Sequence, residues 1–274
     1  MPYMLPPEGP KPARKAYPSD LTDTEWAILE PLLPKKQPRG QSRLHCYREL
    51  LNAIRYVLAE GITWPAMPHD LPPWQTVYSY FRDWQDDGTW KRLHDVLMRA
   101  DRRRVARNEE PSGGIIDSQT VKTMAPGADR GYDGAKRIVG RKRHLVTDSE
   151  GRIAGLDVHD ADRQDPDAGK DVLEVTKAEH PNLAHGWADG RYQDSFVDFA
   201  KESLGIEIEI VQRDAGATGF TLLARRWVIE RTLAWIVKCR RLVRDYEQLA
   251  ESSIAWIYLA MSRIYLHRLA TIAH

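Results

Sequence analysis

The sequence has few cysteines, no long apolar run and almost no net charge, and each shortage excludes a class of protein. The two cysteines among 274 residues, Cys46 and Cys239, have no paired spacing, so neither a disulfide framework nor a zinc site is expected. No apolar run approaches the roughly 20 residues of a transmembrane helix. The N-terminal segment has no apolar signal-peptide core. We therefore expect a soluble protein of a reducing cytoplasm.

The formal net charge is only +1, which argues against a simple basic protein that coats DNA. The basic residues are nevertheless unevenly distributed along the chain. Clustered Arg and Lys suit phosphate neutralisation, although solvated helix faces are the alternative interpretation. The three clusters are Arg99, Arg102, Arg103, Arg104 and Arg107; Lys136, Arg137, Arg141, Lys142 and Arg143; and Arg225, Arg226, Arg231, Lys238, Arg240, Arg241 and Arg244.

The first third of the chain reads as a proline-rich tail followed by helices. Residues 1–18 are expected to be a flexible tail, and residues 19–108 a small all-α domain. Thr22 and Glu25 have the spacing of a helix capping box. A helix-turn-helix-like arrangement that binds DNA is one interpretation, and an ordinary helical bundle is the other. On the expected helix 74–84, the residues that face away from the packing side are Gln75, Tyr78, Ser79 and Arg82.

Beyond a linker at residues 109–113, the pattern changes to strands that alternate with helices. The order is a strand, a two-stranded hairpin, a helix, a strand, a helix, a strand and two helices. This order predicts an α/β fold for residues 114–274, with a mixed sheet flanked by helices. The expected elements are strands 114–117, 143–148, 152–159, 185–189 and 206–211, and helices 168–179, 195–204, 222–246 and 252–274.

Three carboxylates fall where they can meet outside the core. Asp117 is expected to end the first strand and Asp189 the fourth, while Glu230 lies within a late, partly apolar helix. Mg²⁺ prefers a few carboxylates together with water and phosphate oxygens, so these acids could hold two such ions. A simple helix ion pair between Arg226 and Glu230 is the alternative for the third acid.

Other candidate residues receive a structural interpretation. The acids at 157, 160, 162, 165 and 167 are the main rival metal site, but they follow one another along the chain, so we favour a solvated loop. His144 could bind DNA, although a lone His on a strand is more often structural. Trp187 and Trp235 are expected in the core rather than as platforms for base stacking.

Several segments resemble DDE transposases of bacterial insertion sequences, in particular insertion-sequence family five. The resemblance extends from about residue 19 to residue 250, with the motifs in the same order. The resembling segments are residues 64–84 with the run PPWQTVY, residues 115–122 (IIDSQTVK), residues 140–146 (GRKRHLV), residues 188–192 (ADGRY) and residues 225–232 (RRWVIERT), followed by Trp235 and residues 240–242 (RRL).

The resemblance implies a ribonuclease-H-like catalytic domain with Asp117, Asp189 and Glu230 as catalytic metal ligands. Two Mg²⁺ ions would be the cofactor, and Mn²⁺ should substitute. The wider superfamily has a Tyr, an Arg, the Glu and a Lys on the last helix. Here Leu223 occupies the Tyr position, Arg226 fits, and Lys238 falls one residue late. The short interval between Asp189 and Glu230 leaves no room for a large inserted domain.

The function implied is metal-dependent cleavage at transposon ends, followed by joining of the 3′-OH to target DNA. The partners would be the terminal inverted repeats, target DNA and a second copy of the chain, in the bacterial cytoplasm at the nucleoid. The alternatives are a DNA-binding regulator or domesticated transposase that has lost catalysis, and a nuclease that cuts without joining. Besides the helix 74–84, the residues expected to hold DNA phosphates are Lys122, Lys142, Arg143, Arg226 and Lys238.

Overall fold

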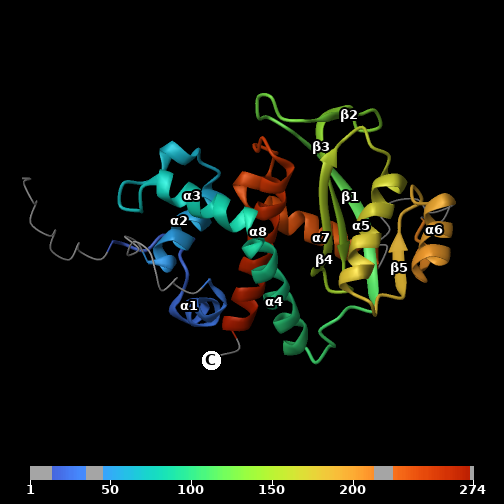
Figure 1. The fold of residues 1–274 in the computed structure, drawn as a ribbon, viewed down its shortest axis with the longest axis horizontal. Helices are drawn as coiled ribbons and strands as arrows, with labels where there is room; N and C mark the ends of the chain where they lie inside the picture. The colour runs from blue at the N-terminus through green and yellow to red at the C-terminus, as the bar shows by residue number, and fades with distance from the viewer. Residues whose placement is uncertain (1–13, 35–45, 213–224, 272–274) are drawn as a thin grey trace, which may run out of the picture.

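The computed structural model describes residues 14–34, 46–212 and 225–271. Most of the predicted proline-rich tail and the position of Leu223 therefore lie outside the described residues. The described chain forms a helical layer, a sheet and a further pair of helices beyond the sheet (Figure 1).

The N-terminal helical layer begins as the sequence predicts. Helix α1 (Asp23–Leu29) starts at a capping box: the Thr22 side chain accepts from the Glu25 amide, and the Glu25 side chain accepts from the Thr22 amide. Helix α2 (Tyr47–Glu60) ends at Gly61, whose φ of +68° suits a residue without a side chain. Helices α3 (Trp74–Asp86) and α4 (Thr89–Arg104) follow, and short 3₁₀ turns, η1 (Glu30–Leu32) and η2 (Trp64–Ala66), connect the layer.

The sheet is mixed, as the order of elements predicted. Strand β1 (Gly113–Lys122) lies at its centre, antiparallel to β3 (Ile138–Thr147) and parallel to β5 (His185–Ala188). Strand β4 (Ile153–Asp160) extends the antiparallel side, and β6 (Glu207–Ile210) extends the parallel side. A short strand, β2 (Gly131–Asp133), pairs with the start of β3; it escaped prediction because three residues carry no usable alternation.

Helices cover both faces of this sheet (Figure 1). Helices α5 (Asp165–Glu179) and α6 (Ser195–Leu204) pack on one face, in a core that contains Ile116 and Val146. On the other face, Ile115 and Leu145 join the core of α7 (Arg226–Val237), α8 (Ala250–Ala270) and the N-terminal helices. Neighbouring residues of β1 thus enter different cores, as the pleat of a strand requires.

Two predicted boundaries were wrong. The first strand was expected to end at Asp117, yet β1 continues to Lys122 because residues 118–122 pair with β3. The long helix expected over residues 222–246 ends at Val237 and is followed by a 3₁₀ turn, η3 (Arg240–Leu242). Beyond η3, Asp245 forms a buried ion pair with Arg141 at 3.0 Å and a β-bridge with Thr123, which hold this segment against the sheet as extended chain.

The C-terminal helix α8 belongs to the packing of the N-terminal layer. Its Trp256 stacks on Phe81 of α3, with ring centroids 4.3 Å apart, and α8 runs along α4. The residues of α1–α4 and α8 share one hydrophobic core. The division of the chain into domains 19–108 and 114–274 stays a prediction, but the helical layer takes its last helix from the far end of the chain.

A buried network of ion pairs joins the helical layer to the sheet. Arg152, at the start of β4, contacts Asp101 of α4 at 2.7 Å and Asp148 of the β3–β4 turn at 3.1 Å, and all three side chains are inaccessible to water or nearly so. Arg102 also pairs with Asp148, and Arg268 of α8 reaches Asp101 at 2.9 Å. Buried charges are tolerated only when they are fully paired, so this network fixes α4, the hairpin and α8 together.

The basic cluster at residues 99–107 does not present free charge, contrary to its interpretation as a phosphate-binding patch. Each of its arginines has a carboxylate partner within the chain, so the cluster is part of the protein's own framework. The pairs are Arg99 with Glu110, Arg102 with Asp148, Arg103 with Glu109, Arg104 with Asp101, and Arg107 with Glu150.

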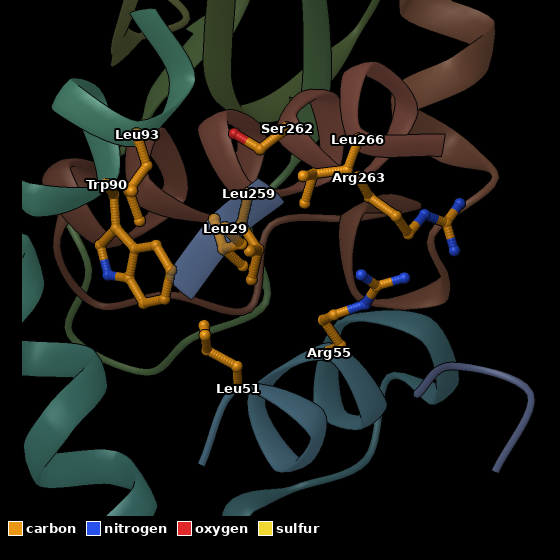
Figure 2. A pocket seen from close by; sticks show the side chains of 9 residues that line it. All are labelled: Leu29, Leu51, Arg55, Trp90, Leu93, Leu259, Ser262, Arg263 and Leu266. Atoms are coloured by element: carbon orange, nitrogen blue, oxygen red, sulfur yellow. The ribbon is translucent and has the colours of Figure 1, made fainter. Parts of the chain in front are cut away.

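A small cavity lies within the helical layer (Figure 2). Leucines of α1, α2, α4 and α8 line it, and Arg55 and Arg263 lie at one side. None of the three predicted catalytic acids lines this cavity, so it is separate from the candidate active site. Within the described residues, no helix is long and apolar enough to cross a membrane.

Replacing Asp101 with Asn should destabilise the protein strongly, because Arg152 and Arg268 would keep their buried or half-buried charge without this partner. We expect the free energy of unfolding to fall by about 3–5 kcal/mol, measured by urea denaturation. Asp171→Ala is the matched control, since it breaks the exposed Arg163–Asp171 pair, which should contribute less than about 1 kcal/mol. Equal losses in the two variants would show that the network does not stabilise the fold.

Candidate active site

Asp117 lies in the middle of β1, on the face that packs toward α7. Its carboxylate is half-buried, and Oδ1 accepts a hydrogen bond from the Ser118 amide at 2.7 Å. The flanking Ile115 and Ile116 are fully buried and anchor the strand between the two cores. Asp117 is thus held by the most constrained strand of the sheet, although it does not end that strand.

Asp189 immediately follows β5, the parallel neighbour of β1. The pairing of Ile115 with Trp187, carried two residues onward, places Asp189 beside Asp117. The Arg191 amide donates to Asp189 Oδ1 at 2.9 Å, which orients the carboxylate at the start of the loop. Strand register thus agrees with the predicted meeting of the two aspartates, which stays a prediction.

Glu230 reaches the same region from α7 through a shared cation. Arg226 Nη2 lies 3.8 Å from Asp189 Oδ2 and 3.7 Å from Glu230 Oε1. The helix ion pair that was the alternative interpretation of Glu230 is thus present, but its arginine also faces Asp189. The Glu230 side chain is 56% exposed and can change its rotamer.

The surroundings of Asp117 disfavour its charged form, mainly because the side chain is buried. Burial, followed by the charge of Asp189, raises the pKa of Asp117 to about 6, while the Ser118 amide and Arg226 act in the opposite direction. A cation bound between the carboxylates would relieve this repulsion. Among the described residues, however, no three acidic, His or Cys side chains already stand close enough to ligate one metal ion.

The acid-rich stretch from Asp157 to Asp167 is not simply a solvated loop. Asp165 is the first residue of α5 and is buried, and its carboxylate contacts Lys142 and Ser118, each at 2.9 Å. Asp162 and Asp167 are exposed, as expected. The solvated-loop interpretation was therefore wrong for Asp165 and also for Asp157 and Asp160, which belong to strand β4. The pairing of Asp165 with Lys142 joins residues too far apart in the chain to be read from spacing.

Two residues predicted to hold DNA are buried instead. Lys142 is 6% exposed, with Nζ bonded to Asp165 Oδ1 at 2.9 Å and to the Arg163 carbonyl at 2.6 Å. Arg143 is 1% exposed and donates to the Leu242 carbonyl at 2.8 Å. Both lie on β3, which is flanked by strands and covered on both faces, so neither can reach a DNA backbone in this arrangement.

The other predicted DNA contacts lie at or near the surface. Lys122 at the end of β1 and Lys238 just after α7 are both exposed, and Arg226 is half-buried between the acids. On α3, Gln75, Tyr78 and Ser79 are exposed, whereas Arg82 is half-buried and 3.7 Å from Asp86. Val77, Phe81 and Trp84 form the buried side of α3, as the helical spacing predicted.

His144 and the two tryptophans have structural surroundings. His144 is fully buried, and its Nε2 lies 2.8 Å from the Tyr192 hydroxyl, behind the loop that carries Asp189. Trp187 and Trp235 pack at the margin of the large core. Arg225 covers the Trp187 ring at 4.3 Å, and Arg231 and Arg268 cover the Trp235 ring, so neither ring is a bare stacking platform.

The fold and the acids together define a ribonuclease-H-like α/β domain: an antiparallel hairpin beside the central strand, parallel strands beyond it, and carboxylates on β1 and just after β5. The model of the family described as "Transposase DDE domain" matches residues 108–265, more than half of the chain, and the chain belongs to this family. A second family model, "Putative transposase of IS4/5 family", matches residues 21–94.

A curated relative agrees with these families. The chain is 32% identical over 117 residues to the "Insertion element IS402 uncharacterized 16.2 kDa protein" of Burkholderia cepacia. The match covers 40% of this chain and 78% of the relative. The helical layer and the sheet thus both resemble parts of insertion-sequence transposases, and the chain is a DNA transposase in this general sense.

The buried His144 predicts a loss of stability in mild acid. Burial lowers the pKa of His144 to about 3, whereas the pKa of a histidine in an unfolded chain is about 6.5. Between these values the unfolded chain binds a proton that the folded protein does not, so stability present above pH 6.5 is lost as the pH falls. The loss from this residue should approach about 1.4 kcal/mol per pH unit below 6.5.

Urea denaturation at pH 7.5 and pH 5.5 measures this effect. The wild type should lose more stability between the two pH values than His144→Gln, by about 1.4 kcal/mol. His185→Gln serves as the control, because His185 is exposed and should leave the pH dependence unchanged. Parallel losses in the wild type and His144→Gln would contradict a neutral, buried His144.

Proposed function

We propose that the protein recognises the terminal inverted repeats of an insertion sequence, cuts the DNA at those ends and joins the freed 3′-OH to target DNA. The observation that carries this proposal is the arrangement around Arg226. This cation lies between Asp189 and Glu230, and the parallel pairing of β1 with β5 supports a position of Asp117 near Asp189. These contacts support a site shared by acids from β1, the loop after β5 and α7.

The donor chemistry of the three acids suits two Mg²⁺ ions. Carboxylate oxygens are the ligands that Mg²⁺ accepts, and a cation would favour the charged form of Asp117, which burial disfavours. Asp117, Asp189 and Glu230 would hold the two ions. When bound, such ions activate the attacking oxygen and stabilise the leaving oxygen of a phosphodiester, and Mn²⁺ should substitute.

The remaining residues would bind and orient the DNA. Arg226, which lies between Asp189 and Glu230, would neutralise charge at the acids, and the exposed Lys122 and Lys238 would contact phosphates farther along. In the first step, water attacks a phosphodiester at the transposon end and releases a 3′-OH. In the second, that 3′-OH attacks a target phosphodiester, so the bond formed replaces the bond broken and no external energy source is required.

Two transposon ends must be held together for joining, so we propose that two or more copies act on DNA. In each copy, α3 would present Gln75, Tyr78 and Ser79 to base edges, with Arg82 near the backbone. The exposure of the first three side chains and the rigid packing of the opposite face of α3 support this assignment.

Removing any one acid should slow cutting strongly without preventing DNA binding. Asp117→Asn, Asp189→Asn and Glu230→Gln should each slow end cleavage on the order of 10²–10³-fold, since each removes a group that organises transition-state charge. Labelled duplexes with the element's own ends, in Mg²⁺ and in EDTA, give the rates of nicking and joining separately. Asp167→Asn, which alters an exposed acid of α5, should cut normally.

The outcomes separate the proposed function from its rivals. Specific binding without cleavage by the wild type would favour a DNA-binding regulator. Cleavage without joined products would favour a nuclease. Full cleavage activity in Glu230→Gln would remove Glu230 from the catalytic set while leaving the two aspartates in place.

Recognition by α3 is tested separately from cleavage. Gln75→Ala and Ser79→Ala should weaken binding to the terminal repeat by about 1–3 kcal/mol per lost base contact, with little change on unrelated DNA. Fluorescence anisotropy at fixed salt measures both affinities. Lys201→Ala, on the exposed side of α6, is the control. If the α3 variants lose affinity equally for all sequences, α3 contacts only the backbone.

A further inference from the structure

The loop after β5 carries a cation that the sequence had not singled out. Arg191 follows Asp189 by two residues, and its amide holds Asp189 Oδ1 at 2.9 Å. Its guanidinium Nη1 reaches Asp165 Oδ2 at 3.2 Å, while the side chain remains 51% exposed. One residue therefore ties the Asp189 carboxylate to the start of α5 and still faces solvent.

Asp165 is a fixed anchor for this arginine. It is 8% exposed and accepts hydrogen bonds from Ser118 Oγ and Lys142 Nζ, both at 2.9 Å. Ser118 follows Asp117 on β1, so its hydrogen bond fixes the position of Asp165 relative to the strand that carries Asp117. Although burial alone would raise it, the pKa of Asp165 is lowered by the bonds from Lys142, Ser118 and Arg191.

The charge of Arg191 is not needed to neutralise Asp165. Lys142, itself buried, already supplies one positive charge to that carboxylate. Among the described residues, Asp165 is the only acceptor of the Arg191 side chain, so most of its five N–H donors remain available. The Arg191 amide contacts Asp189 Oδ1, so this side chain extends from the same short loop as that acid.

The same construction recurs farther along β1. The Thr120 hydroxyl donates to the buried Asp133, which also accepts from the Lys136 amide at 3.0 Å. Lys136 Nζ lies 3.3 Å from Thr120 Oγ1 and lowers the pKa of Asp117. Hydroxyls of β1 thus donate to two buried carboxylates. Asp165 contacts the Arg191 guanidinium, whereas the Lys136 ammonium contacts Thr120 rather than Asp133.

We propose that Arg191 binds a phosphate of the DNA strand being cut, beside Asp117 and Asp189, and that Asp165 is the positioning residue that holds it there. A planar guanidinium with free parallel donors fits two phosphate oxygens, and a lysine does not reproduce that fork. This inference rests on the proposed function. It also gives the buried Lys142 a role, because Lys142 completes the anchor without contacting DNA.

The proposed contact of Arg191 with a DNA phosphate can be tested by neutralising one phosphate of the DNA at a time. The probe is a duplex with the terminal inverted repeat that flanks the gene for this chain, carrying one uncharged methylphosphonate at each position around the cut in turn. Affinities are measured in EDTA, so binding is read without catalysis. For the wild type, one such substitution near the cut should weaken binding about tenfold to a hundredfold, the usual loss of a charge-assisted hydrogen bond.

Arg191→Ala should bind the unmodified probe as weakly as the wild type binds that modified probe. It should then be indifferent to the same methylphosphonate. For this variant, the slope of log affinity against log salt concentration should be shallower by about one than for the wild type. Arg191→Lys should recover the salt slope but only part of the affinity, and Asp165→Asn should reduce the methylphosphonate effect. Arg163→Ala, whose partner Asp171 is exposed, should behave as the wild type.

The outcomes separate this inference from the proposed function. The contact would be overturned if every methylphosphonate weakened binding by Arg191→Ala as much as it weakens binding by the wild type, and if the salt slope were unchanged. This conclusion would hold even if the wild type cuts normally. A wild type that binds with the expected coupling but does not cut in Mg²⁺ would keep the phosphate contact and overturn the proposed cleavage. A wild type that does not bind the probe would overturn both. Urea denaturation of each variant checks that the fold is retained.

Discussion

The ion pairs around Arg152 are the constraint on which the arrangement of the protein depends. They connect α4, the β3–β4 turn and α8 through charges buried where each must find a partner. A hydrophobic contact tolerates small shifts, whereas a buried charge that loses its partner costs several kcal/mol. The helical layer and the sheet that carries the acids are therefore coupled through α4 and α8, which fixes how the two are placed relative to each other.

The sequence predicted those features whose physical cause is local or follows from strand register. The capping box at Thr22, the buried side of α3 and the mixed sheet depend on spacing along the chain. Parallel pairing of β1 with β5 puts Asp117 and Asp189 on neighbouring strands or just after them. The spacing along the chain predicted the contact of Glu230 with Arg226, whereas the approach of the same arginine to Asp189 could be seen only in the structure.

The sequence could not show which charges are paired inside the molecule. Lys142 and Arg143 looked like a surface patch because their partners, Asp165 and the Leu242 carbonyl, lie far along the chain. The end of α7 was missed for the same reason, since the pairing of Asp245 with Arg141 competes with continued helix. A run of basic residues thus indicates that negatively charged or polar partners lie nearby. Only the folded structure shows whether those partners belong to DNA or to the protein itself.

The passage of α8 through the N-terminal layer has a consequence for synthesis of the chain. Helices α1–α4 emerge first, but the Trp256 surface that closes their shared core follows some 150 residues after α4. A nascent or truncated chain that stops before α8 would already contain Asp117, Asp189 and Glu230, but its N-terminal helices would lack part of their core. The order of the chain therefore makes the helical layer the last part of the fold that can be completed during synthesis.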